Sequence, residues 1–452
     1  MNSYCTSSQS GRHSKELIDI RILREEPEKI RDNLEKRNMR DFPFDELLET
    51  DLKRRRLITQ NQKLKEERNK MSAEIAELKK KGEDAHDLIE RMRDVSERIQ
   101  QNEVEIASAE KNLHNLLLRL PNFLDPEVPI GPDDSANKEI RRWGSINESL
   151  KIHHVEVAEN LDLLDTERAA KVAGSRFYFL KRDLVRLNFA LITYGLDFLK
   201  EKGFVLLQPP FMLKREAIAG AVMLSDFEDV IYKIQDEDLY LIGTSEHAIA
   251  AMHMGEILDA RQLPLRYAGI SPCFRKEAGA HGKDTKGIFR VHQFEKVEQF
   301  VLCEPERSEE EHRFLLSNAE QFMQSLGIPY RVVLLSSGDM GKVASKTFDI
   351  ESWMPAQGRY RELISCSNCT DFQARALGIK YRPKPHEESI FLHTLNSTLV
   401  ATERTLVAII ENYYQSDAKA VSIPKALRPY MNGMDSIVPV DRGNEQTARI
   451  DP

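Results

Sequence analysis

The chain has few cysteines for its length and no long apolar run. Its 452 residues contain five cysteines, too few for a disulfide scaffold, which predicts a reducing compartment and a cytoplasmic location. No window approaches the roughly 18 apolar residues of a membrane span, so we expect no membrane contact. The Ser-rich start contains no apolar stretch typical of a secretory signal. A frayed terminus accounts for this start, with a short organellar targeting segment as the alternative.

A surplus of positive charge is also missing. The chain has 65 Lys+Arg against 73 Asp+Glu, a net charge of −8. This acidity argues against a protein that is basic over its whole surface, although a local basic face could still bind nucleic acid. At roughly 150 residues per domain, the length predicts two to four domains with a sizeable core.

Proline is absent between residues 45 and 120, and this stretch contains a single glycine. Apolar residues recur at heptad spacing through both of its halves: Leu57, Leu64, Met71, Leu78, Leu88, Met92, Val95, Ile99, Ile106, Leu113, Leu116 and Leu120. Gly82 lies between the halves in the polar run KKKGEDAHD, where the chain can reverse. The pattern therefore predicts an antiparallel coiled-coil hairpin.

Charge is unevenly divided between the two halves of this hairpin. Residues 51–81 hold eleven basic and five acidic side chains, whereas residues 85–120 hold five basic and seven acidic ones. A basic surplus on one helix is expected if that helix meets a phosphate backbone. The alternative is a solvated coiled coil whose charges only keep it in solution.

The remainder of the chain divides by composition. Residues 121–138 are rich in Pro, Asp and Gly and predict a linker between an N-terminal domain (1–120) and a globular domain (139–438). Residues 439–452 lack an apolar stripe and predict a loose tail.

Within the globular domain, helical patterns such as residues 169–203 alternate with short β-rich runs. These runs cover residues 204–208, 239–244, 265–270 and 297–303. Because several strands follow one another without a full helix between them, we expect an α+β fold with an antiparallel sheet flanked by helices.

The chemistry of the chain is concentrated in residues 271–300. The sequence has no P-loop and no G-x-G-x-x-G, so a nucleotide would be held by side chains. Arg275 and Glu277 are two positions apart, and on a strand they would share one face, the first suited to a phosphate or carboxylate and the second to an amine. Arg290 and Lys296 add positive charge. The alternative is an exposed hairpin with surface ion pairs.

Three motifs carry a family resemblance. GFVLLQPPF (203–211, with Pro210), FRKE (274–277) followed by GIFRVHQFEKVEQ, and LNSTLVATERTLVAIIEN (395–412, with Arg404) are similar to motifs 1, 2 and 3 of class II aminoacyl-tRNA synthetases. Together with the predicted hairpin, their order and spacing resemble those of a seryl-tRNA synthetase of the bacterial type. The resemblance covers nearly the whole chain. It implies the class II antiparallel sheet with an N-terminal coiled-coil arm.

The resemblance also implies roles for particular residues. Arg275 and Arg404 would be catalytic, and Glu362 and Ser365 would bind Mg²⁺ on the phosphates. The implied serine site comprises Thr244, Ser245, Glu246, Arg275, Glu298 and Thr398. The implied ATP site comprises Arg275, Lys276, Glu277, Val291, Phe294, Glu362, Leu363, Ile364, Ser365 and Arg404.

The implied activity is that of a serine–tRNA ligase. Serine and ATP would give seryl-adenylate and pyrophosphate, and the seryl group would pass to the terminal adenosine of tRNA(Ser). The basic arm, residues 51–81, would bind the tRNA, and the segment near Pro210 would form a homodimer interface. The alternatives are an inactive synthetase-like regulator that binds tRNA or nucleotide, and an enzyme that activates an amino acid for a carrier protein.

The sequence departs from the family pattern at three places. The loop at residues 244–246 reads Thr-Ser-Glu where many relatives have Thr-Ala-Glu, and Thr402 and Glu403 precede Arg404 where small residues are frequent. The segment CSNC (366–369) could suggest zinc. Because the sequence holds no second C-x-x-C or paired histidine that would complete four ligands, we expect buried thiols and no zinc.

Overall fold

A computed structural model describes residues 18–148, 150–223, 230–277 and 286–439. The expected loose tail and the Ser-rich start therefore lie almost entirely outside the described residues. The described residues form two compact units, one within residues 18–35 and 39–120 and the other within residues 36–38 and 121–439. None of the described helices combines the length and the apolarity that crossing a membrane requires.

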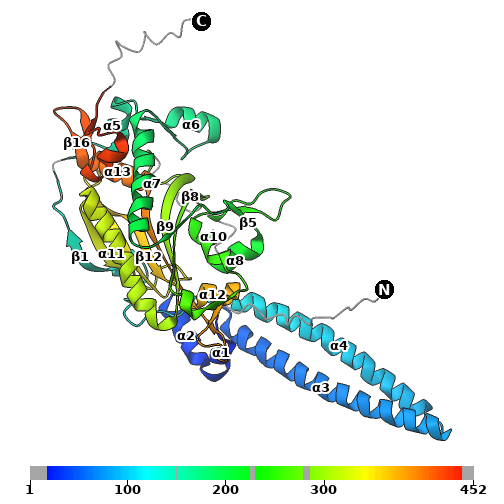
Figure 1. Cartoon of the computed structure of the whole chain (residues 1–452). Helices are drawn as coiled ribbons and strands as arrows, with labels where there is room; N and C mark the ends of the chain where they lie inside the picture. Colours follow the sequence, from blue (N-terminus) through cyan, green and yellow to red (C-terminus); the bar gives the residue numbers. More distant parts are fainter. Residues whose placement is uncertain (1–17, 149, 224–229, 278–285, 440–452) are drawn as a thin grey trace, which may run out of the picture. The chain divides into compact units, whose positions relative to one another are not determined.

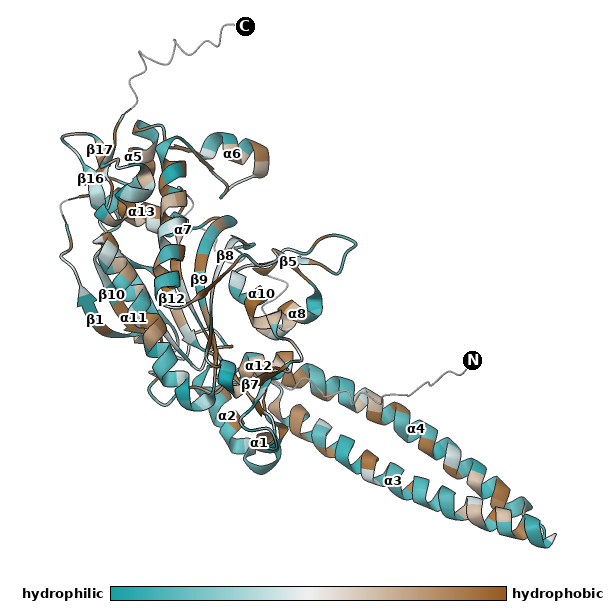
Figure 2. Ribbon diagram, in the orientation of Figure 1, coloured by the Kyte–Doolittle hydropathy of each residue, from teal (hydrophilic) through white to brown (hydrophobic). Residues whose placement is uncertain are grey.

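The first unit contains the predicted hairpin. Its helices are α1 (Ile20–Glu25), α2 (Pro27–Lys36), α3 (Phe44–Lys81) and α4 (His86–Leu117). Gly82 ends α3 in the left-handed conformation, with φ of 74°, and the chain reverses there as expected (Figure 1). Figure 2 shows both long helices as mostly hydrophilic, with hydrophobic residues at intervals along them. The heptad positions Leu64, Met71, Val95 and Ile99 form a buried cluster, which confirms the coiled-coil arm.

The second unit is built on an eight-stranded sheet. Its strands in spatial order are β1 (Lys138–Trp143), β10 (Tyr330–Leu334), β11 (Lys346–Met354), β12 (Arg359–Asn368), β15 (His393–Ala401), β9 (Gln293–Cys303), β8 (Leu265–Phe274) and β4 (Val205–Leu207). All neighbours pair antiparallel except β4 and β8, which pair parallel. The expected α+β fold is therefore confirmed, with one parallel edge.

Helices cover this sheet, and small sheets lie beside it (Figure 1). The helices of this unit are α5 (His154–Asn160), α6 (Thr166–Ala173), α7 (Asp183–Glu201), α8 (Arg215–Ala221), α10 (Ser245–Met252), α11 (Ser308–Leu326), α12 (Phe372–Leu377) and α13 (Thr402–Tyr413). The short strands are β2 (Leu164–Asp165), β3 (Phe179–Leu180), β5 (Met212–Leu213), β6 (Tyr240–Leu241), β7 (Ile257–Asp259), β13 (Lys380–Arg382), β14 (Ile390–Phe391), β16 (Tyr414–Gln415), β17 (Ala420–Ser422) and β18 (Ser436–Ile437). The apolar faces of α7, α11 and α13 join the sheet in one core, in which Leu191, Phe322 and Ile409 are fully buried.

The helical pattern over residues 169–203 is not one helix. It contains the end of α6, the short strand β3 and α7. Gly174 caps α6 with a φ of 99°, and Arg182 also has a positive φ just before α7. Because neither conformation continues an α-helix, the chain breaks twice where the apolar periodicity alone predicted continuity.

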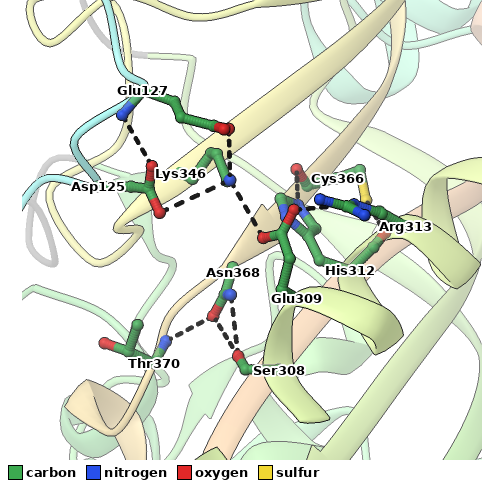
Figure 3. A network of polar contacts seen from close by, with 10 residues as sticks. All are labelled: Asp125, Glu127, Ser308, Glu309, His312, Arg313, Lys346, Cys366, Asn368 and Thr370. Carbon is green, nitrogen blue, oxygen red and sulfur yellow. Dashed lines mark hydrogen bonds and ion pairs between the residues drawn. The ribbon is translucent and has the colours of Figure 1, made fainter. Parts of the chain in front are cut away.

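The predicted linker, residues 121–138, is irregular but is fastened to the sheet unit. Figure 3 shows Lys346 of β11 pointing at carboxylates of this segment and of α11. The Lys346 ammonium lies 2.9 Å from Glu127, 3.1 Å from Glu309 and 3.6 Å from Asp125. Burial alone would lower the pKa of Lys346, but the hydrogen bonds to Glu127 and Glu309 and the charge of Asp125 outweigh burial and raise it. The segment is therefore an integral part of this unit.

Candidate active site

A cavity of about 1020 Å³ opens over the sheet of the second unit. It brings together most of the residues singled out from the sequence: Thr244, Glu246, Arg275, Glu277, Val291, Phe294, Glu298, Glu362, Leu363, Ser365, Thr398 and Arg404. Three others, Ser245, Lys276 and Ile364, are not among its lining residues. Ser245 is fully buried with its hydroxyl donating to the Gly269 carbonyl, and Ile364 packs in the core.

One end of the cavity is built around a buried carboxylate, Glu298 of β9. Lys296, two positions earlier on the strand, forms an ion pair with it, and both side chains are almost fully buried. The hydroxyl of Thr398, its register partner on β15, donates to Glu298 Oε2 at 3.3 Å. Burial raises the pKa of Glu298 against the opposing effect of Lys296.

A second carboxylate, Glu246, lies at the N-terminus of α10. Thr244 caps this helix by accepting a hydrogen bond from the Glu246 amide at 3.3 Å. Glu246 Oε1 accepts from the amide side chains of Gln373 at 2.8 Å and Asn396 at 3.2 Å. Burial and the charge of Glu298 raise the pKa of Glu246 to about 7. This end of the cavity therefore presents two carboxylates that can accept hydrogen bonds from an ammonium or a hydroxyl group.

Arg275 lies beside these carboxylates. Its Nε donates to the Gly243 carbonyl at 3.1 Å, and its guanidinium lies 5.1 Å from the centre of the Phe294 ring. The expectation that Arg275 and Glu277 share one face of a strand is wrong, because β8 ends at Phe274 and Glu277 has a φ of 51°. Both side chains nevertheless line the cavity, because the backbone turns there.

The other end of the cavity is defined by Arg404, in the first turn of α13. Its guanidinium lies 3.2 Å from the Glu362 carboxylate and donates to the Glu362 carbonyl at 3.1 Å. It also stacks over Phe289, as does Arg361, at 5.2 and 4.1 Å from the ring centre. The charge of Arg404 lowers the pKa of Glu362, which stays ionised as a cation ligand requires.

A further carboxylate, Asp349 of β11, adjoins this end of the cavity. Asp349 is the register partner of Ser365 on β12, and it is 7% exposed. Its Oδ1 has no hydrogen-bond partner among the described residues. Burial, followed by the charge of Glu362, raises its pKa well above the usual range. An orphaned buried carboxylate oxygen beside Glu362 and Ser365 fits a hard divalent cation such as Mg²⁺.

The two thiols of the CSNC segment lie in different surroundings. Cys366 is fully buried and its Sγ contacts the His312 carbonyl at 3.8 Å, whereas Cys369 lines the cavity and accepts from Asn396 at 3.5 Å. Burial raises the pKa of both thiols. Within the described residues, neither thiol belongs to a group arranged to hold a metal ion.

Sequence reasoning did not single out Asp349, Asn396 or Gln373. For two of them the spacing along a strand was a usable signal. Asp349 and Glu351 are two positions apart on β11, and Asn396 lies two positions before Thr398 on the same face of β15. Gln373 lies on the short helix α12 and reaches Glu246 through tertiary packing alone, so its sequence neighbourhood gave no indication.

Comparisons with known proteins decide the family. A profile described as the tRNA synthetase class II core domain (G, H, P, S and T) matches residues 230–413, and one described as the seryl-tRNA synthetase N-terminal domain matches residues 17–124. The serine–tRNA ligase of Nitrosopumilus maritimus is 53% identical over 93% of this chain and all of its own length. The chain belongs to the seryl-tRNA synthetase family.

Solved structures of the seryl-tRNA synthetase family agree with this assignment. A seryl-tRNA synthetase from Pyrococcus horikoshii complexed with ATP matches 94% of this chain and all of that chain, with a TM-score of 0.89 and 47% identity. A cytoplasmic serine–tRNA ligase from Naegleria fowleri in complex with AMP matches 93% of this chain and 98% of that one, with a TM-score of 0.84 and 36% identity. The expected bacterial type is not supported, because the curated relatives at about 50% identity are archaeal.

Proposed function

We propose that this chain activates L-serine with ATP to form seryl-adenylate and pyrophosphate, and then transfers serine to the terminal adenosine of tRNA(Ser). The observation that carries this proposal is a single cavity with paired carboxylates, Glu246 and Glu298, at one end and arginines Arg275 and Arg404 further along it. Carboxylates suit the ammonium and hydroxyl groups of serine, and arginines suit the phosphates of ATP. The family membership supports the same activity.

Activation requires positioning and charge compensation more than a general base. A serine carboxylate oxygen attacks the α-phosphorus, the new P–O bond forms, and the bond to the pyrophosphate oxygen breaks. We assign Arg275 to the serine carboxylate and the α-phosphate, because its side chain lines the cavity and its Nε is already fixed to the Gly243 carbonyl. Arg404 is assigned to the γ-phosphate. Phe294 and Arg404 would lie on opposite sides of the adenine ring, and Glu277 would accept a hydrogen bond from the adenine amine.

Mg²⁺ is the cation that the residues around Glu362 fit. We propose that Glu362 and Ser365 coordinate it and that Asp349 Oδ1 completes or orients this ligand set. When bound, Mg²⁺ supplies charge neutralisation on the phosphates. The protein alone presents three oxygen-bearing side chains on neighbouring strands β11 and β12, which keeps the ligands in a fixed geometry.

Serine selection follows from the buried pair Glu298 and Thr398. We propose that the substrate hydroxyl hydrogen-bonds to this pair and that its ammonium lies against Glu246. Alanine brings no hydroxyl to this buried pair, and a site built for a hydroxyl rejects the analogue lacking it by about 10⁴-fold. The ion pair with Lys296 opposes the effect of burial on the pKa of Glu298 and so favours the charged form, which accepts hydrogen bonds.

Several wider assignments belong to the same proposal. The basic helix, residues 51–81, would bind the tRNA, the region near Pro210 would form a homodimer interface, and the protein would work in the cytoplasm. We propose residues 1–120 as the tRNA-binding domain and residues 139–438 as the catalytic domain, to which the segment 121–138 is fastened, with residues 439–452 as a tail.

Ion pairs within the hairpin refine which basic residues of the arm can bind RNA. Lys53, Arg54, Arg55, Lys65 and Lys81 form ion pairs with acidic residues of α3 and α4. Others form none among the described residues: Arg56, Lys63, Arg68, Lys70, Lys79 and Lys80. A phosphate can bind a basic residue of the first set only after it displaces the acidic partner of that residue. We therefore assign tRNA contact to the basic residues without such a partner.

Replacing Glu298 with alanine tests the serine assignment. We expect serine-dependent pyrophosphate exchange to fall by at least about 100-fold, because the hydroxyl loses its charged acceptor and Lys296 is left buried without its partner. The affinity for ATP, measured by isothermal titration, should change by less than about threefold. Glu298→Gln, which preserves the side-chain volume, separates the loss of charge from a packing defect. Equal losses of serine activation and ATP binding would contradict the assignment.

The raised pKa of Glu246 predicts a pH dependence. With a pKa of about 7, Glu246 is protonated below neutral pH and can no longer attract the serine ammonium by its charge. The KM for serine should therefore rise as pH falls from 8 to 6, while the KM for ATP stays nearly constant. Measuring both constants by pyrophosphate exchange across this range, with Glu246→Gln as the control, checks the result. A flat serine KM in the unsubstituted protein would contradict it.

Aminoacylation tests the function as a whole. The chain, incubated with ATP, Mg²⁺, radiolabelled serine and total tRNA, should yield acid-precipitable seryl-tRNA. Exchange of pyrophosphate without charging would favour the alternative of an activator for a carrier protein, and the absence of both reactions would favour the inactive regulator.

A further inference from the structure

His154 and Glu411 form a buried pair outside the cavity. The side chains are 1% and 0% exposed, and His154 Nδ1 lies 3.0 Å from Glu411 Oε1. His154 begins α5, and Glu411 lies two turns after Arg404 on the same helix, α13. Within the described residues, these two with His153 form the group whose ligand atoms lie close enough to hold a metal ion.

Hydrogen bonds argue against a metal there and define the state of the pair. The backbone amide of Ile288 donates to His154 Nε2 at 3.4 Å, so this nitrogen carries no proton and its lone pair accepts the hydrogen bond from Ile288. Nδ1 must then carry the proton and donate to Glu411. Glu411 also accepts from the His154 amide at 3.4 Å and, through Oε2, from the Ala356 amide at 3.3 Å. A metal ligand needs a free imidazole lone pair, and His154 has none to offer.

The same bonds join three parts of the cavity wall. Ile288 belongs to the segment that re-enters the core before β9, Ala356 lies in the turn between β11 and β12, and Glu411 lies on the helix that carries Arg404. The next residue, Phe289, is the ring on which Arg404 and Arg361 both stack. The position of the Ile288 amide therefore constrains where this ring lies, and the ring, together with Glu362, holds the Arg404 guanidinium.

The fit at this contact is tight. Gly287 has a φ of 79°, and a Cβ added there would lie 2.0 Å from His154 Nε2. The imidazole ring therefore packs directly on the backbone of the segment as well as bonding to it. Ile288 is 1% exposed, so its amide has no water to replace His154 as an acceptor.

We propose that His154, held by Glu411, is a positioning residue that fixes residues 287–291 so that Phe289 holds Arg404 in place to bind ATP. This inference deepens the proposed function and depends on it. It assigns to His154 no contact with substrate. The role needs the Nε2 acceptor on the segment, whereas the Nδ1 bond to Glu411 anchors the ring in the core.

Two substitutions separate the two ring nitrogens. His154→Asn places an amide near Nδ1, keeping the bond to Glu411 and losing that to Ile288. His154→Gln places an amide oxygen near Nε2, keeping the bond to Ile288 and losing that to Glu411. In pyrophosphate exchange, we expect His154→Asn to raise the KM for ATP by about tenfold with the serine KM within twofold, and His154→Gln to leave the ATP KM within about threefold.

Two further readouts distinguish positioning from general stability. Hydrogen–deuterium exchange across residues 287–291 should be faster in His154→Asn and unchanged in His154→Gln. The unfolding temperature should fall at least as much in His154→Gln as in His154→Asn. Gly287→Ala disturbs the same contact from the segment side and should raise the ATP KM even where His154 variants fold poorly.

The inference would be overturned if the ATP KM rose in every variant in proportion to the fall in its unfolding temperature. A normal ATP KM in both His154→Asn and Gly287→Ala would also overturn it. The absence of exchange in the unsubstituted protein would instead overturn the proposed function.

Discussion

Arg275→Ala should lower kcat/KM for serine-dependent pyrophosphate exchange by about a thousandfold. Removing one positioned donor from developing oxyanion charge costs about 10²–10³ in rate, and an arginine that stabilises a phosphoryl transition state is worth 10³–10⁵. Arg275 is assigned both the carboxylate nucleophile and the α-phosphate, so its loss removes alignment as well as charge. The guanidinium is already oriented by the Gly243 carbonyl, so the unsubstituted protein has little reorganisation to make.

Two variants control this experiment. Arg275→Lys keeps the positive charge but loses the Nε bond to Gly243, and it should recover only a small part of the activity because lysine cannot bind two oxygens in a fixed plane. Arg261→Ala removes an arginine whose side chain is 89% exposed and should leave exchange unchanged. A loss below about tenfold in Arg275→Ala, with the fold intact by circular dichroism, would contradict the assigned role.

Removing the outer part of the arm should abolish charging of tRNA while leaving adenylate formation intact. Replacing residues 58–104 with a short loop keeps the base of the hairpin, including the ion pairs of Arg24 with Asp51 and of Lys53 with Glu105. The cavity residues all lie in the other unit, so serine-dependent exchange should stay within about twofold. Serylation of tRNA should fall below detection, because the phosphate contacts that hold the tRNA are gone.

Charge substitution tests the arm without shortening it. Lys63, Arg68 and Lys70 replaced together by glutamine should weaken tRNA binding by about 100-fold and reduce its dependence on salt, since each lost phosphate contact removes one released counterion. The matched control is the double substitution Lys53→Glu and Glu105→Lys, which reverses an ion pair whose charges already neutralise one another. This variant should bind tRNA normally. A similar loss in both variants, or a drop in adenylate formation itself, would contradict the proposed division of labour.

The hairpin and the sheet were predictable because their signals are local and repeated. Leu64, Met71, Val95 and Ile99 follow the heptad and are buried together, and the chain reverses at Gly82, as its place in a polar run indicated. The successive β-rich runs correctly indicated an antiparallel sheet. These features depend on periodicity within a segment, which the sequence records directly.

Features that depend on distant packing were missed or misplaced. The strand expected through Arg275 and Glu277 ends at Phe274, because the next residues leave the sheet: the Lys276 amide donates to the Val230 carbonyl and Glu277 has a positive φ. Gly174 broke a continuous apolar pattern, and Gln373 reached Glu246 from a helix with no indicative motif. Ser245, expected in the serine site, is buried under Gly269. In each case tertiary contacts, which no short window of sequence contains, decided the outcome.

The candidate site illustrates the same division. Family motifs brought Glu298, Thr398, Arg275 and Arg404 together from separate segments, and the structure places all four on one cavity. The orphaned oxygen of Asp349 and the contact of His154 with Ile288 became visible only with coordinates, because each depends on burial or on a backbone amide rather than on residue type.

Pyrophosphate exchange with each of the twenty amino acids in turn tests the central claim most directly. The account predicts exchange with serine that exceeds exchange with alanine by about 10⁴-fold, since only serine brings a hydroxyl that can hydrogen-bond to Glu298 and Thr398. Preferred exchange with any other amino acid, or none with serine while ATP still binds, would contradict it.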